Sequence, residues 1–207
     1  NRSITWLLCP ILLWAQEPVK IPKDALSPLV VTAQGGFPEL LGNSPWSLTQ
    51  LKTDDLLISS QSMPEALTGM PSVMVQKTAL GQSSPYIRGL TGYHNVLLVD
   101  GIRLNHSAMR SGPNQYWSTV ELYGTNHIEA LRGSYGTLYG ADAVGGVVNV
   151  LSSKPSFGYG EKYSSGEFFS RLSSAERSWI VGILGEVTSG DWFVEVSHTE
   201  RSFGDLE

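Results

Sequence analysis

The sequence lacks the features that mark several common classes of protein. It contains a single cysteine, Cys9, which excludes an internal disulfide and a cysteine-rich metal site. Its 14 Lys and Arg residues are outnumbered by 19 Asp and Glu residues and form no basic cluster, so the footprint of a nucleic-acid-binding protein is missing. No apolar run is long enough for an internal transmembrane helix. The 41% hydrophobic content and 22 glycines suit a water-soluble domain or a β-barrel, whose strands alternate apolar and polar residues.

Motifs of the common catalytic sites are also missing. There is no G-x-S-x-G, no P-loop and no H-E-x-x-H, and the glycines after Leu131 do not have dinucleotide-binding spacing. His94, His106 and His127 invite a haem or metal interpretation, but they lack helical or Cys-paired ligand spacing. We therefore expect a protein that is not an enzyme and that holds no metal and no cofactor.

The amino end has the pattern of an export signal. Residues 1–15, NRSITWLLCPILLWA, contain Arg2 followed by an apolar run that is too short to span a bilayer and that ends at Ala15. We interpret them as a secretory signal peptide with a clipped start. A lipoprotein signal at Cys9 is disfavoured because Leu8 is not a small residue, and a buried apolar strand or helix is the alternative.

A short apolar segment follows on a tether. Residues 16–28 hold three prolines among charged residues and are expected to be extended. The next five residues lie between Pro28 and a pair of glycines, and such a segment is suited to adding itself as a strand to the edge of another protein's sheet. The first strand of the folded domain would have the same composition, so both interpretations stay open. The segment comprises Leu29, Val30, Val31, Thr32 and Ala33.

The middle of the chain predicts a small domain of short strands and short helices. A helix is expected after Thr53, and another from Pro64 to Leu67, where Ser62 and Glu65 have capping-box spacing. Asp100-Gly101 between two apolar runs predicts a tight hairpin. The expected strands are 46–51, 73–77, 86–88, 95–99, 102–104, 128–131 and 147–151.

Four motifs in this region resemble one family. Within residues 128–155 the stretch LRGSYGTLYGADAVGGVVNV, with glycine at 133, 136, 140, 145 and 146, resembles the closing signature of the plug domain of TonB-dependent outer-membrane receptors. SMPEALTGMPSVMV at 62–75, YIRG at 86–89 and VLLVDGIRL at 96–104 resemble three further elements of that domain, in the family's order. The glycine-rich stretch then reads as the structural seal of a plug and not as a ligand loop.

The resemblance implies an architecture. Residues 38–155 would form an α+β plug domain, a small mixed sheet with short helices, and residues 156–207 would begin a transmembrane antiparallel β-barrel. Residues 16–37 would be a periplasmic tether whose segment 29–33 is the TonB box. The implied location is the outer membrane of a Gram-negative cell, with the plug in the barrel lumen. The implied partners are the TonB protein with its inner-membrane energising complex, outer-membrane lipid, and a siderophore, haem or cobalamin-type ligand.

The resemblance also implies where the solute binds. Residues 105–117 show no periodicity, and a connection of that length in a compact domain is functional or disordered. In the family, such loops form the floor of the ligand site at the outer face of the plug. For any single residue, a solvated loop position is the simpler alternative. The ligand-contact candidates are Tyr93, His94, His106, Arg110, Asn114, Gln115 and Tyr116.

Three charged residues lie in or beside apolar runs. Arg88, Glu129 and Arg132 would need partners if they are buried. The resemblance implies that charges at these positions tie the plug to itself and to the inner barrel wall, holding it seated yet releasable. A surface ion pair of little energetic value is the alternative.

The carboxyl end alternates apolar and polar residues. After the Ser- and Gly-rich residues 156–166, one face of each run is apolar, and residues 188–191 make a turn between the runs. Transmembrane β-strands have this pattern, and so does a half-buried soluble sheet. Because plugged barrels have about 22 strands and the sequence holds about three, we expect the barrel to continue beyond it. The apolar positions are Trp179, Val181, Ile183, Val187, Trp192, Val194 and Val196.

The function that the resemblance implies is active import of a scarce large solute by TonB-driven rearrangement of the plug. A secreted soluble β-rich binding protein or enzyme is the alternative. A receptor that also signals would need a further folded domain before the plug, and residues 16–28 are too few to form one.

Overall fold

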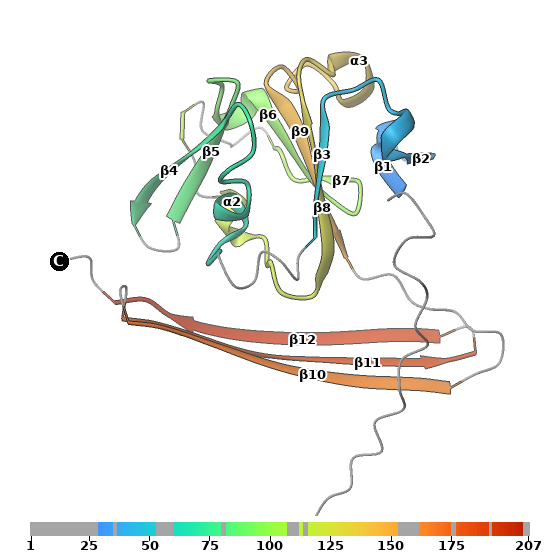
Figure 1. Ribbon diagram of the computed structural model, residues 1–207, viewed down its shortest axis with the longest axis vertical. Helices are drawn as coiled ribbons and strands as arrows, with labels where there is room; N and C mark the ends of the chain where they lie inside the picture. The colour runs from blue at the N-terminus through green and yellow to red at the C-terminus, as the bar shows by residue number, and fades with distance from the viewer. Residues whose placement is uncertain are drawn as a thin grey trace, which may run out of the picture.

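The computed structural model shows a plug-like domain, residues 29–152, and a separate three-stranded sheet, residues 162–202 (Figure 1). The expected signal peptide, the helix expected after Thr53, and Arg110, Asn114 and Gln115 lie outside the described residues. Among the residues that are described, no helix is long and apolar enough to cross a membrane. The structure describes residues 29–34, 37–52, 60–79, 82–106, 112–113, 116–152, 162–174, 177–190 and 192–204.

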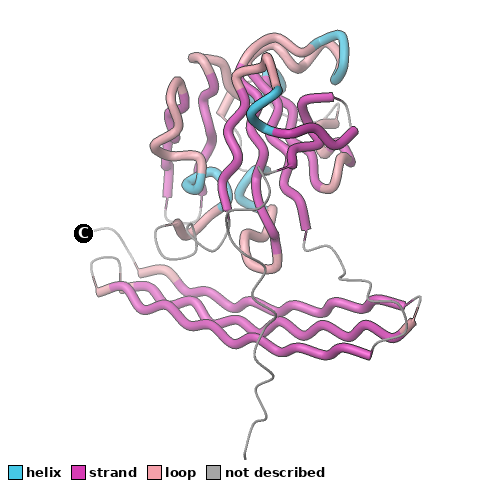
Figure 2. The backbone as a smooth tube through the Cα atoms, turned by 45° about the vertical axis from the view of Figure 1, so that its right-hand side comes forward, coloured by secondary structure: helices cyan, strands magenta, loops and turns pink. Residues whose placement is uncertain are grey.

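A five-stranded mixed sheet organises the plug-like domain. Its order is β3-β8-β9-β6-β7, in which β6 and β9 are parallel and the other neighbours are antiparallel. Figure 2 shows the strands of this domain apart from the three long strands of the separate sheet. The predicted hairpin is confirmed, because Asp100 and Gly101 take φ values of 50° and 80° between β6 and β7, as a two-residue hairpin turn requires. The strands are β3 Leu48–Lys52, β6 Asn95–Val99, β7 Ile102–Arg103, β8 Thr125–Arg132 and β9 Gly146–Ser152.

The central strands of this sheet, β8, β9 and β6, are largely buried on both faces, and each face has its own apolar core. Successive residues of β8 alternate between the two cores, as the pleat of a strand dictates: Ile128 and Ala130 belong to the first core and Leu131 to the second. The first core also contains Met63, Leu67, Ile87, Leu97, Trp117, Leu122, Val148 and Val150. The second also contains Val30, Val96, Leu98, Tyr135, Ala143 and Val147.

Short elements cover the two faces. The first core lies beneath helix α2, the 3₁₀ helix η3 and a hairpin made of β4 and β5. The second core lies beneath strand β1, which pairs with β2, and beneath the turn that contains helix α3. These elements are β1 Leu29–Gln34, β2 Phe37–Leu40, η1 Leu41–Asn43, α2 Met63–Ala66, β4 Val73–Ala79, β5 Gln82–Ile87, η2 Gly92–His94, η3 Tyr116–Thr119 and α3 Gly136–Tyr139.

The capping box expected at α2 is wrong in its hydrogen bonds. Ser62 is the N-cap residue, but its side chain does not cap the helix; its Oγ lies 3.0 Å from Ser83 Oγ on β5. Glu65 Oε2 accepts the N–H of Gln61, one residue earlier than the pattern predicts. The helix is only four residues long, and a tertiary partner on β5 has taken the hydroxyl that a longer helix would use.

Two adjacent glycines let three strands approach closely. A Cβ at Gly146 would lie 2.5 Å from Leu131 O, and a Cβ at Gly145 would lie 2.2 Å from Asn95 Oδ1 and 2.9 Å from Ile87 O. All three distances are too short for a side chain to be added without a shift of its neighbours. The backbone of the glycine-rich stretch therefore packs directly against the neighbouring strands at this point, and its role as a structural seal stays a prediction.

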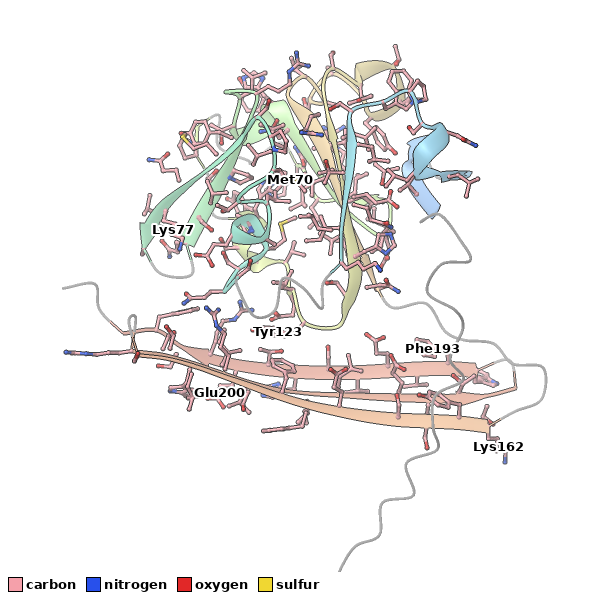
Figure 3. The ribbon with its side chains drawn as sticks, viewed as in Figure 1. Met70, Lys77, Tyr123, Lys162, Phe193 and Glu200 are labelled. Carbon is pink, nitrogen blue, oxygen red and sulfur yellow. The ribbon has the colours of Figure 1, made fainter. Side chains whose placement is uncertain are left out.

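The three-stranded sheet has the alternation predicted for it. β10 Lys162–Ser173, β11 Ser178–Ser189 and β12 Trp192–Ser202 pair antiparallel without a register shift. One face points to the plug-like domain and carries Phe193, and the other carries Glu200 and an exposed apolar stripe (Figure 3). β10 begins inside the stretch expected to be a boundary. The stripe includes Phe168, Leu172, Trp179, Ile183, Val187, Trp192, Val194 and Val196.

Replacing Gly146 by alanine should destabilise the plug-like domain, because the added Cβ would meet the carbonyl of Leu131. We expect a loss of about 1–3 kcal/mol in its free energy of unfolding, the usual cost of overpacking. Urea unfolding of the full-length protein, followed by tryptophan fluorescence, measures this. Gly136→Ala is the matched control, because a Cβ there meets nothing within 4 Å and no positive φ is needed. Equal stability of the two variants would contradict the close approach.

Candidate functional site

Strand β1 contains the segment 29–33 that the sequence offers as a TonB box. In this structure it pairs with β2, with Leu29 opposite Leu40 and Val30 opposite Glu39. The side chains of Val30 and Thr32 are buried against the domain. The segment is thus docked, and the coupling role expected for it stays a prediction.

Thr32 is held to the domain through all its polar groups. Its N–H donates to Glu129 Oε2 at 2.7 Å, its carbonyl oxygen accepts from the Tyr139 hydroxyl at 2.7 Å, and its Oγ1 accepts from Asn149 Nδ2 at 3.0 Å. We call these four residues the Thr32 clamp. Burial, and after it the charge of Glu129, raises the pKa of Tyr139 above its ordinary value of 10, so its hydroxyl is a proton donor at neutral pH.

Glu129 is the centre of the clamp and is completely buried, with 0% of its side chain exposed. Its Oε1 lies 3.2 Å from His127 Nε2, and its Oε2 accepts the Thr32 N–H. A buried carboxylate needs such partners, because burial without them would cost several kcal/mol. The partners seen here are inside the plug-like domain, so a contact between Glu129 and a barrel wall stays a prediction.

Of the other two charged residues, Arg132 is bonded within the plug-like domain and Arg88 is exposed. Arg132 donates from Nη1 to Pro71 O at 3.0 Å and from Nη2 to Thr49 Oγ1 at 3.0 Å, which joins β8 to β3 and to the turn before β4. Arg88 is exposed and has a positive φ of 54°. The predicted contacts of Arg88 and Arg132 with a barrel wall remain predictions.

A different set of residues joins the plug-like domain to the three-stranded sheet. Arg201 of β12 forms an ion pair with Glu121, and its Nη1 lies 3.4 Å from Gln61 O. Tyr123 stacks on Phe169 of β10, with ring centroids 4.0 Å apart and planes 10° apart. Figure 3 shows Tyr123 at the edge of the domain nearest the sheet. We call Glu121, Tyr123, Phe169 and Arg201 the seat. Sequence reasoning missed it, because these residues belong to no motif and their partners are distant in the chain.

A glycine makes the aromatic part of the seat possible. Gly182 of β11 is the cross-strand partner of Phe169, and a Cβ at Gly182 would lie 2.0 Å from Phe169 Cζ. The ring therefore lies flat across β11 in the space that a side chain would occupy, and from there it reaches Tyr123. Burial is the largest cause that raises the pKa of Tyr123.

The ligand-contact candidates that are described form two aromatic pairs. Tyr93 and His94 on η2 have ring centroids 4.4 Å apart, and His106 meets Tyr116 of η3 edge to face at 5.5 Å. Tyr93 and Tyr116 are more than a third exposed. Within the described residues, no group of three or more His, Cys, Asp or Glu side chains could hold a metal ion. Contact with a solute stays a prediction for all of them.

Substituting alanine for Gly182 should loosen the seat, because the new Cβ would push the Phe169 ring off Tyr123. An aromatic pair contributes about 0.5–1.5 kcal/mol beyond its buried area, so the plug-like domain should unfold at a lower urea concentration within the intact full-length protein. Gly185→Ala on the same strand is the control, since its Cβ would meet only Val196 O at 4.0 Å. If both variants behave like the wild type, the stack does not hold the domain.

Comparison with known proteins agrees with this geometry. The family model for the TonB-dependent receptor plug domain matches residues 41–147, just over half of the 207 residues. The vitamin B12 transporter BtuB of Photobacterium profundum is 35% identical over 97 residues, which cover 46% of this chain and 16% of that protein. An iron-regulated outer membrane virulence protein of Vibrio cholerae is 33% identical over 134 residues, covering 61% and 20%.

Solved structures show the same fold. The ferripyoverdine receptor of the Pseudomonas aeruginosa outer membrane, bound to ferripyoverdine, superposes with a TM-score of 0.61 at 16% identity and covers 84% of this chain and 22% of that chain. The sequence thus spans about a fifth of the length of the proteins it resembles. The predicted α+β plug followed by antiparallel strands is confirmed. The chain belongs to the TonB-dependent receptors of the Gram-negative outer membrane, and it contains their plug domain.

Proposed function

We propose that this chain is the plug and first barrel strands of a receptor that imports a scarce large solute by TonB-driven rearrangement of the plug. The observation that carries the proposal is the position of β1. The segment 29–33 lies at the amino end of the plug domain and is attached to the sheet by the Thr32 clamp. Force applied to this strand would act directly on the buried face of the five-stranded sheet.

The solute class is inferred from the relatives. One similar protein is a vitamin B12 transporter, another is an iron-regulated outer membrane protein, and a structural neighbour was solved with ferripyoverdine. We infer a cargo of the siderophore-iron, haem or cobalamin class. Tyr93, His94, His106 and Tyr116 are the described residues that would contact it, and their paired rings offer apolar faces with polar edges.

The mechanism needs no covalent chemistry. The solute would bind at the outer face, the TonB protein would pair with the edge of β1 by strand addition, and pulling would withdraw β1 from the plug. The seat would keep the plug attached to the barrel wall meanwhile, through the Glu121–Arg201 ion pair and the Tyr123–Phe169 stack.

A secreted soluble binding protein or enzyme is the second candidate. The outer face of β10–β12 argues against it, because Phe168 is 67% exposed, Leu172 83% and Trp192 76%. A contiguous apolar stripe of this kind on a soluble protein is a liability, whereas lipid would cover it. Recovery of the full-length protein from the periplasm without detergent would favour this second candidate.

Replacing Val31 by proline should abolish uptake. Proline removes a backbone donor and cannot take part in a regular ladder, so strand addition by a partner would fail. Growth tests of a deletion strain on single iron or cobalamin sources would first identify the cargo. Uptake of that cargo by Val31→Pro should then fall to the level of the deletion strain, while Val31→Ile should transport normally. Normal uptake by the proline variant, present in the outer membrane at wild-type level, would refute the coupling role.

Reversing the charge of Arg132 should impair uptake but leave the protein inserted. Arg132→Glu would remove the donors to Pro71 O and Thr49 Oγ1 and place a carboxylate against the Pro71 carbonyl, so the plug would lose the side-chain bonds that join β8 to β3 and to the turn before β4. Uptake at limiting substrate and the amount of protein in the outer membrane test this. Arg132→Lys keeps one donor group, so its uptake should lie between that of the wild type and that of Arg132→Glu. Unchanged uptake by Arg132→Glu would eliminate the proposed role.

A further inference from the structure

One buried amide joins the strand at the start of the plug domain to the residues at its end. The side chain of Asn149 on β9 is 3% exposed. Its Nδ2 donates to Thr32 Oγ1 at 3.0 Å, and its Oδ1 accepts the N–H of Gly101 at 3.1 Å. Asn149 is thus the member of the Thr32 clamp that also touches the turn between β6 and β7.

The Asp100-Gly101 turn is also bonded to the end of β9. Asp100 Oδ1 accepts the N–H of Ser152 at 2.9 Å, and its Oδ2 accepts the Ser152 hydroxyl at 2.8 Å. Ser152 is the last described residue before the three-stranded sheet begins at Lys162. Hydrogen bonds joined by the Asp100-Gly101 peptide link therefore connect β1, through Asn149 and the turn, to Ser152 at the end of β9.

The two hydrogen bonds of Asn149 are linked because opposite ends of one planar amide group make them. The Gly101 N–H can only donate, so the amide oxygen must face it, and the amide nitrogen is then directed to Thr32. The amide cannot turn over without placing its NH₂ group against the Gly101 N–H, and while β1 is docked the Thr32 hydroxyl also holds its nitrogen end. If β1 leaves, Nδ2 loses its acceptor on Thr32 and the amide becomes free to bond water.

We propose that Asn149 is a positioning residue that transmits the docking of β1 to the Asp100-Gly101 turn and, through it, to Ser152. Withdrawal of β1 would loosen the hydrogen bonds that fasten the plug's carboxyl end. That β1 is the strand that moves in the working receptor rests on the proposed function; the connection itself does not.

We call this transmission from β1 through Asn149 to the turn the relay. Two backbone hydrogen bonds also support the turn, and they define what the relay would and would not change. The Asp100 N–H donates to Val150 O at 2.9 Å, and the Leu104 N–H donates to Leu97 O at 2.9 Å. These backbone bonds do not involve Asn149. A relay therefore predicts a local change at the Gly101 and Ser152 amides, without general loosening of β6 and β9.

Hydrogen exchange of individual amides tests the relay in the full-length protein, without TonB and without solute. Thr32→Val removes the hydroxyl that Asn149 holds and keeps the shape and backbone of the strand. We expect exchange at Gly101 to accelerate about tenfold, the effect of losing one hydrogen bond of ordinary strength, with a smaller acceleration at Ser152. Thr32→Ser, which restores the hydroxyl, should return both amides to wild-type rates.

Thr49→Val is the matched control. This substitution removes the Thr49 hydroxyl on β3, which accepts from Arg132 of β8 and lies outside the relay. The exchange rate of the Gly101 amide should therefore stay unchanged. Adding Thr32→Val to an Asn149→Ala variant should give no further acceleration at Gly101, because the connection is already cut. Wild-type exchange at Gly101 in Thr32→Val, or equal acceleration in Thr49→Val, would overturn the proposal.

The two proposals fail separately. If Val31→Pro abolishes uptake while Gly101 does not respond to Thr32→Val, the relay is wrong and the coupling role of β1 stands. If Gly101 responds but Val31→Pro transports normally, the relay stands and the proposed function is wrong.

Discussion

A carboxylate sealed beneath a strand is the constraint on which the plug domain depends. Glu129 has no exposed surface, and one of its oxygens is bonded to the backbone N–H of Thr32, 97 residues earlier in the chain. A charge in such a place is tolerated only while its hydrogen-bond partners stay, because an uncompensated buried charge costs several kcal/mol. The position of β1 and the burial of Glu129 therefore stabilise each other, and either one without the other is unfavourable.

The two faces of the five-stranded sheet differ in what covers them. The first core lies on the side of α2 and η3, and the residues that join the plug to the barrel strands, Glu121 and Tyr123, follow directly after η3. The second core lies under β1, which pairs with β2 and not with the five-stranded sheet in the part of the chain that the structure describes. The contacts with the three-stranded sheet and the docking of β1 thus use different faces of the five-stranded sheet.

Local patterns predicted the local structure. Asp100-Gly101 encoded its turn in two residues, and the alternation of Trp192, Val194 and Val196 encoded the outer face of β12. Failures came where a distant partner decided the outcome. The Ser62 hydroxyl was expected to cap α2, but it lies against the Ser83 hydroxyl on β5. Glu65 was expected to accept the N–H of Ser62, but it accepts the N–H of Gln61.

The same limit applies to the site. Composition identified 29–33 as a segment able to pair with the edge of another sheet. It could not show that the plug itself binds this segment, since the partners of Thr32 come from β8, α3 and β9, which are distant in the sequence. Glu129 and Arg132 were recognised as charges that need partners, yet the partners are backbone, hydroxyl and imidazole groups that no pattern marks. Glu121 and Tyr123 carried no pattern at all.

The glycine pair explains why the clamp residues meet. Period-2 alternation means that a shift of β9 by one residue would turn Asn149 to the opposite face of the sheet. The pair fixes the register, because positions 145 and 146 both exclude a side chain and a shift of one residue either way would bring Val144 or Val147 into one of them. This register places Asn149 opposite Glu129 on one side and Leu98 on the other. A side chain at position 146 would therefore disturb more than local packing. It would move the amide away from Thr32 and Gly101 together, so the stability of the glycine-rich stretch and the docking of β1 should change in parallel.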